Sequence, residues 1–194
     1  MTAAAGRRWL MWWPVIALAA TFALGWAVGP RSTPFDDWFH RFRHTPARGL
    51  LFFTDPWLLT VALLFGIAVA VYSCRRRLAV AMAVSPLAGI ALVQLLKRIF
   101  GRHDGASLAY PSGHTATAVI VIGMLVLLAG AAGWAVFVAV LFLLLAMVGQ
   151  GVTYHYFTDT VGALLLGCAV VCVAALAARL DTRQPDCDAD HTAR

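Results

Sequence analysis

Glutamate is absent from this chain, and charge of either sign is scarce. Its nine carboxylate side chains are all aspartates, and charged residues make up only 12% of the 194 residues, whereas 61% are hydrophobic. Such a composition excludes an ordinary soluble domain, in which about a quarter of the residues are charged. It indicates an integral membrane protein and makes each Asp outside the C-terminal tail informative.

The net charge of +6 does not indicate a nucleic-acid-binding protein. The Arg residues lie at the ends of apolar stretches, where lipid headgroups and membrane orientation explain them. Nucleic-acid binding needs an accessible, soluble basic face, and none is expected here. We therefore expect membrane lipids, and no nucleic acid, as partners.

Uncharged runs long enough to cross a bilayer predict an all-α protein with six transmembrane helices in one bundle. A helix needs about 20 apolar residues to cross a hydrocarbon core of about 30 Å. The predicted spans are 9–29, 56–73, 78–96, two within 115–154 that are joined by a turn at 130–133, and 160–178. A cleaved signal peptide is the alternative for the first run, although its apolar length exceeds that of the usual signal.

Residues 1–180 are therefore expected to form the membrane domain, and the polar residues 181–194 a disordered cytoplasmic tail. An even number of crossings places both termini on one side. The basic residues divide almost equally between the two sides, but the run 75–77 in a very short loop favours the cytoplasm for that loop. Segments 97–114 and 150–159 then emerge together on the outer face.

His155 and Asp159 are four residues apart where the last predicted span begins. One helical turn brings residues of this spacing to the same face. A carboxylate that binds one imidazole nitrogen leaves the other with a free lone pair, which a nucleophile or base needs. A structural hydrogen-bonded pair is the alternative, because the spacing alone has low specificity.

A Tyr-Pro-Ser-Gly-His segment, residues 110–114, precedes the fourth predicted span. Pro and Gly interrupt the chain there, so backbone N–H groups such as that of Gly113 are exposed at a helix N-terminus, which attracts phosphate. Ser112 adds a hydroxyl donor, and His114 is placed to protonate a leaving oxygen. The alternative is a capped helix start without chemistry.

Positive charge for a phosphoryl group is expected from Lys97 and Arg102 in the same outer segment. The alternative for Lys97 is a lysine that only extends to the membrane interface. The outer loop 30–49 mixes aromatic and basic residues and is interpreted as an interfacial anchor or a headgroup contact. No metal or other cofactor is expected, because the outer face lacks the carboxylate cluster of a two-metal phosphatase.

These residues resemble the type-2 phosphatidic acid phosphatase family, whose fold is a helical bundle shared with vanadium-dependent haloperoxidases. The resemblance covers about residues 50–180 and is closest to bacterial members. Residues 111–114 match the family's Pro-Ser-Gly-His motif completely, and His155 and Asp159 match the His and Asp that end its third motif.

The chain departs from the family pattern at both motif arginines, which fall on Asp104 and Gly149. Arg102 is the expected substitute for the first. Arg41 or Arg43 of the outer loop is a speculative further source of positive charge.

The resemblance implies a lipid phosphatase of the bacterial cytoplasmic membrane with its active site on the outer face. His155 would attack phosphorus to give a phosphohistidine, Asp159 would orient it, and His114 would protonate the departing oxygen. The implied phosphate-binding residues are Lys97, Arg102, Ser112 and Gly113. The implied substrates are polyprenyl diphosphates, phosphatidic acid or phosphatidylglycerol phosphate. Phosphoryl transfer to another acceptor, and binding or transport of lipid phosphate without chemistry, remain alternatives.

Overall fold

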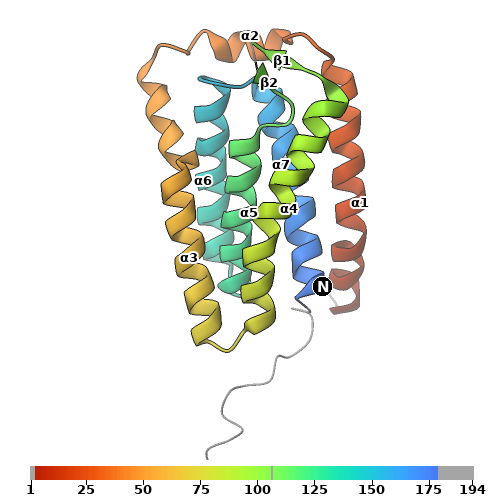
Figure 1. Cartoon of the computed structure of the whole chain (residues 1–194), viewed down its shortest axis with the longest axis vertical. Coiled ribbons are helices and arrows are strands. Elements are labelled where there is room, and N and C mark those ends of the chain that lie inside the picture. The colour runs from red at the N-terminus through yellow and green to blue at the C-terminus, as the bar shows by residue number, and fades with distance from the viewer. Residues whose placement is uncertain (1–2, 106, 179–194) are drawn as a thin grey trace, which may run out of the picture.

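The computed structural model describes residues 3–105 and 107–178. Within them all regular secondary structure is helical except for one two-stranded hairpin. Its long helices run alternately up and down a single bundle (Figure 1). They are α1 (Ala3–Val28), α3 (Pro56–Tyr72), α4 (Arg76–Phe100), α5 (Gly113–Leu128), α6 (Gly133–Gly151) and α7 (Phe157–Ala177). The tail predicted for residues 181–194 lies outside the described residues.

Five stretches of the described chain are long and apolar enough to cross a membrane. They are Leu10–Val28, Pro46–Tyr72, Arg76–Phe100, Gly133–Gly151 and Phe157–Ala177. The remaining predicted crossing, α5, has 16 residues, or about 24 Å of helix, which is shorter than a hydrocarbon core of about 30 Å. The all-helical fold is thus confirmed, and five helical stretches of the described residues have the length and composition of membrane spans, whereas six crossings are not established.

Helix α5 lies inside the bundle and packs against α3, α4, α6 and α7. Small residues allow α7 to approach it closely: a Cβ added at Gly167 would lie 2.6 Å from Cγ1 of Val119. A helix surrounded by other helices needs little surface facing lipid. Its short length also sets its N-terminus, where His114 lies, below the ends of the longer helices (Figure 1).

Short elements that the sequence did not predict cover one end of the bundle (Figure 1). They are α2 (Pro34–His40), the 3-10 helix η1 (Pro46–Thr54), and the hairpin of β1 (His103–Asp104) and β2 (Ser107–Leu108). Helix α2 begins with a capping box in which the Thr33 hydroxyl accepts from the backbone N–H of Asp36 and the Asp36 carboxylate accepts from that of Thr33. We call this end the polar end.

At the opposite end, Arg75 closes the C-terminus of α5. Its guanidinium donates hydrogen bonds to the carbonyl oxygens of Leu128 and Leu127 at 2.6 and 3.3 Å. These carbonyls belong to the last turn of a helix, where the carbonyl groups have no N–H donor within the helix. The first arginine of the run that indicated orientation therefore also has a structural role.

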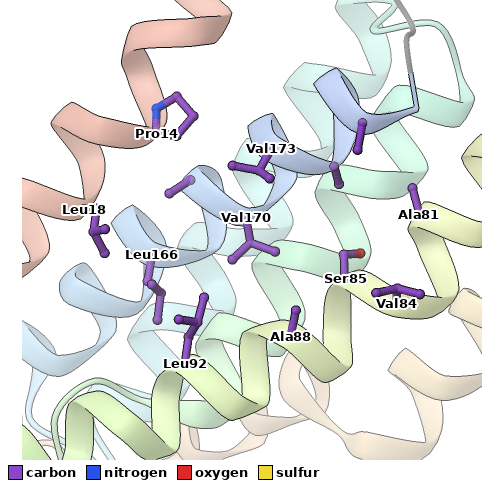
Figure 2. A pocket seen from close by; sticks show the side chains of 13 residues that line it. Pro14, Leu18, Ala81, Val84, Ser85, Ala88, Leu92, Leu166, Val170 and Val173 are labelled. Atoms are coloured by element: carbon purple, nitrogen blue, oxygen red, sulfur yellow. The ribbon is translucent and has the colours of Figure 1, made fainter.

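A cavity of about 320 Å³ lies between α1, α4 and α7. Figure 2 shows Leu18 of α1, Leu92 of α4 and Val170 of α7 facing it. Ser85 is the one polar residue among those that line this cavity. Because it holds no ionisable group, this cavity is not a site for acid–base or phosphoryl chemistry.

Gly149 provides a test of how η1 packs on α6. A Cβ at this position would lie 2.6 Å from the carbonyl carbon of Leu50, and backbone cannot move aside as a side chain can. We expect Gly149→Ala to lower the free energy of unfolding by about 1–3 kcal/mol, measured by thermal unfolding in detergent. The control is Gly133→Ala in the same helix, where a Cβ would meet nothing within 4 Å. Equal stability of the two variants would contradict this packing.

Candidate functional site

Three ionisable side chains from separate segments of the chain meet at the polar end. Lys97 lies in the last turn of α4, His114 in the first turn of α5, and His155 in the turn before α7. His114 is close enough to both His155 and Lys97 to interact with them electrostatically. The predicted convergence of segments 97–114 and 150–159 is thereby confirmed.

A backbone hydrogen bond joins the two segments that carry the histidines. The N–H of Ser112 donates to the carbonyl oxygen of Asp159 at 3.1 Å. The Ser112 side chain is fully buried and caps α5, because its Oγ accepts from the N–H and the hydroxyl of Thr115 at 3.4 and 3.1 Å. Ser112 was expected to bind phosphate; here its hydroxyl holds the helix start. Gly113 is the first residue of α5, so its N–H belongs to the unpaired first turn.

His155 and Asp159 face each other as their spacing predicted. The imidazole Nδ1 lies 3.8 Å from Asp159 Oδ2, within ion-pair range but longer than a hydrogen bond. Both side chains are buried, and Nδ1 has no hydrogen-bond partner within the described residues. Since Nδ1 is turned toward the carboxylate, Nε2 is the nitrogen left to act on a substrate.

The buried guanidinium of Arg102 lies between two buried carboxylates. Nη1 donates to Asp159 Oδ1 and to the hydroxyl of Thr158, both at 2.7 Å, and Nη2 donates to Asp36 Oδ2 and to the carbonyl oxygen of Arg31, both at 2.9 Å. All four Nη hydrogens are used, and the side chain is 1% exposed. Arg102 was expected to bind phosphate, but in this arrangement only its Nε–H is left to donate.

Asp36 is the carboxylate of this end that sequence reasoning missed. Besides Arg102, it accepts hydrogen bonds from the backbone and hydroxyl of Thr158 at 2.9 and 3.0 Å and from those of Thr33 at 3.0 and 2.9 Å. Burial raises the pKa of Asp36, but these hydrogen bonds outweigh burial and lower it below its usual value. The sequence signal was the Thr33 to Asp36 capping box, which identifies a helix start but no distant partner.

Two tyrosines pack around this network. The ring of Tyr156 lies under the Arg102 guanidinium, 4.3 Å from Cζ to the ring centre. Burial raises the pKa of Tyr156 and, more strongly, that of Tyr110. The Tyr110 phenol therefore stays neutral and donates to the carbonyl oxygen of Thr21 in α1. These contacts connect α1 to the residues that precede His114.

Lys97 has capacity left for a ligand. Its half-buried ammonium donates to the carbonyl oxygen of Leu108 at 2.6 Å, and no second acceptor for it lies in the described part of the chain. Two ammonium hydrogens are therefore available beside His114. The ammonium thus faces the interior of the polar end and binds protein there, which a lysine that only extends to the membrane interface would not do.

Asp104 and Gly149 stand where the motifs of the resembled family have arginine, and both residues make other contacts. Asp104 pairs with Arg43 at 3.2 Å, so this outer-loop arginine, a speculative phosphate ligand, instead fixes the hairpin. At Gly149 the backbone of η1 leaves no room for any side chain. The next residue, Gln150, is buried and donates to the hydroxyl of Thr54 at 2.6 Å. Arg43 and Arg102 therefore do not replace the positive charge that arginines at these two positions would provide.

Among the described residues, no group of three or more His, Cys, Asp or Glu side chains is placed to hold a metal ion. Comparisons with protein families, with curated proteins and with solved structures found no match for this chain. The site is therefore interpreted from its own residues: a lysine and two histidines at one end of an apolar helical bundle, backed by a buried network of two carboxylates and one arginine.

Arg102→Met tests whether the buried guanidinium is structural. It leaves Asp36 and Asp159 as buried carboxylates without their common partner, so we expect a loss of about 3–5 kcal/mol of unfolding free energy. Thermal unfolding in detergent measures this loss. The matched control is Arg98→Met, four residues earlier and exposed, which should change stability little. Similar stability of the two variants would show that the network does not hold this end together.

Proposed function

We propose that this chain is a membrane-embedded phosphatase that hydrolyses a phosphate monoester or diphosphate on a lipid. The observation that carries the proposal is the meeting of His114, His155 and Lys97 at one end of the bundle. Two imidazoles and an ammonium group are the groups that metal-independent phosphoryl transfer requires: a nucleophile, an acid and a positive charge. The resemblance to type-2 phosphatidic acid phosphatases supports the same assignment.

In the first step, Nε2 of His155 attacks phosphorus and the bond between phosphorus and the leaving oxygen breaks. Protonated His114 gives its proton to that oxygen, so the alcohol or phosphate departs neutralised by one proton. In the second step a water oxygen attacks phosphorus, the phosphorus–nitrogen bond breaks, and the water proton passes to His114. Asp159 stabilises the positive charge that develops on the His155 ring.

The phosphoryl oxygens would lie between Lys97 and the N-terminus of α5. The ammonium has two hydrogens to donate, and the first-turn N–H groups of α5, beginning at Gly113, add the positive end of the helix dipole. We place Arg102 and Ser112 behind this set, because the four Nη hydrogens of Arg102 are bound within the protein and Ser112 Oγ accepts two bonds from Thr115. They support the site through these bonds, and the Nε–H of Arg102 and the hydroxyl hydrogen of Ser112 are the donors they have left.

The lipid assignment rests on where this site lies. Apolar helices extend from it along the bundle, so a substrate can keep its tail in the bilayer while its phosphate reaches the polar end (Figure 1). We propose that α5 crosses the membrane as the sixth helix despite its length, with the termini in the cytoplasm and the site outside. Polyprenyl diphosphates, phosphatidic acid and phosphatidylglycerol phosphate are the candidate substrates.

A second candidate function is binding or transport of a lipid phosphate without chemistry. It is favoured by one observation: the charge of Arg102, which binds the same Asp159 that faces His155, is balanced by two buried carboxylates, so the site has little net positive charge. Transfer of the phosphoryl group to an acceptor other than water is a third possibility. Reaction in isotopically labelled water separates hydrolysis, which puts the label in phosphate, from transfer.

Replacement of the two histidines tests the proposed chemistry. We expect His155→Ala to lower phosphate release from lipid phosphates in detergent by at least about 1,000-fold, and His114→Ala by about 100- to 10,000-fold. The control is His103→Ala, in the exposed hairpin, which should keep its activity. Undiminished release in both active-site variants would refute the assignment. Orthovanadate, a mimic of five-coordinate phosphorus, should inhibit the unaltered protein.

Lys97→Gln tests phosphate binding separately from the nucleophile. Loss of the ammonium removes stabilisation that grows as charge develops on the phosphoryl oxygens, so kcat/KM should fall by about 100-fold or more. Lys97→Arg, which keeps the charge, should retain more activity than Lys97→Gln. Steady-state kinetics with one short-chain lipid phosphate measures all three proteins. If Lys97→Gln matched the unaltered protein, Lys97 would be an interfacial residue only.

A further inference from the structure

Asp36 of α2 is a buried carboxylate that the proposed chemistry does not use directly. Its Oδ2 accepts from Arg102 at 2.9 Å, and the same guanidinium donates to Asp159 Oδ1 at 2.7 Å. Asp159 Oδ2 faces His155 Nδ1 at 3.8 Å. We infer that Asp36 is a positioning residue for His155, acting through Arg102 and Asp159. The inference rests on the proposed function for the role of His155 as nucleophile.

The geometry of Asp36 is fixed from two sides. Thr33 holds it from α2 through the capping box, and Thr158 holds it from the first turn of α7 through its backbone N–H and its hydroxyl. The Thr158 hydroxyl also accepts from Arg102 Nη1 at 2.7 Å. Because Thr158 directly precedes Asp159, α2 and the carboxylate that orients the nucleophile are held as one unit.

The charges explain why a second carboxylate is needed. Arg102 carries one positive charge and is shared between Asp36 and Asp159. With Asp36 ionised, the three groups together carry one negative charge, so Asp159 keeps a net attraction for the His155 ring. Without the charge of Asp36, Arg102 would be balanced by Asp159 alone, and that attraction would weaken.

Asp159 and His114 interact with His155 directly. The other titratable and charged groups of the polar end are Lys97, Arg102, Asp36, His40, Tyr156, Tyr154 with its partner Arg48, and Asp104 with its partner Arg43. Most of these groups are cationic or neutral. The loss of one carboxylate charge should therefore register at the imidazole.

Asp36→Asn tests the coupling, because it removes the charge while keeping the shape. The pKa of His155 is followed by NMR of protein carrying labelled histidine, with the signal assigned from His155→Gln. We expect Asp36→Asn to lower that pKa. The acid limb of the pH–rate profile should move the same way, and kcat should fall about 10- to 100-fold.

Two further variants separate positioning from simple support. Thr33→Ala removes the two hydrogen bonds of the Thr33 hydroxyl, one donated to the Asp36 carboxylate and one accepted from the Asp36 backbone N–H, without changing charge. It should therefore lower stability and leave the pKa of His155 unchanged. The double variant Asp36→Asn/Arg102→Met removes both charges and frees Asp159 from its guanidinium partner. The net charge beside His155 is then again one negative charge, carried by Asp159 alone, so the pKa of His155 should recover at least to its value in the unaltered protein. This variant decides the question if Asp36→Asn does not fold.

A pKa of His155 that stays unchanged in Asp36→Asn, or that falls in the double variant, would overturn the inference. The titration needs no turnover, so it is independent of the proposed function. The predicted shifts in a protein without phosphatase activity would refute the proposed function but leave the coupling standing. Activity together with an unshifted pKa would refute the role of Asp36 alone.

Discussion

The arrangement of the polar end depends on one buried cation. Arg102 is enclosed by Asp36, Asp159, Thr158 and a backbone carbonyl. A charge can be buried only where such partners surround it, because desolvation costs several kcal/mol per ion. The partners come from α2, from the segment before it and from the start of α7. Because the guanidinium and the carboxylates need each other as partners, they fix the relative positions of these three segments more firmly than apolar packing alone would.

Much of the fold could be predicted from apolar runs, because each crossing needs a long uncharged stretch and the chain contains few charges to interrupt one. The predicted spans 56–73 and 160–178 differ from α3 and α7 by at most three residues at either end. Helix α2, η1 and the hairpin were not predictable in this way. They are short, and they exist through contacts such as Arg43 with Asp104, which no local pattern records.

The candidate site, like the fold, could be predicted from the sequence only in part. His114 and His155 could be located because each lies in a distinctive local pattern at the end of an apolar run, and topology then placed both on one face. The environment of Arg102 could not be predicted. An arginine near a phosphate-binding motif is equally consistent with a ligand for phosphate and with a partner for buried carboxylates. What decides is Asp36, which lies 66 residues away in sequence.

The same network limits how the site can bind an anion. With Arg102 neutralised by two carboxylates, the cation left beside the histidines is Lys97, supported by the start of α5 and by any proton on His114. Under the proposed function, His114 would supply countercharge in the ground state and lose it as the leaving oxygen is protonated. A site with so little fixed positive charge would hold free phosphate weakly, which would favour release of that product. The substrate would then be kept near the site chiefly by partition of its tail from water into the bilayer, to which each buried methylene contributes about 0.8 kcal/mol. The lack of an unpaired arginine among the described residues of the site thus favours a substrate that is already concentrated in the bilayer over a soluble phosphate ester.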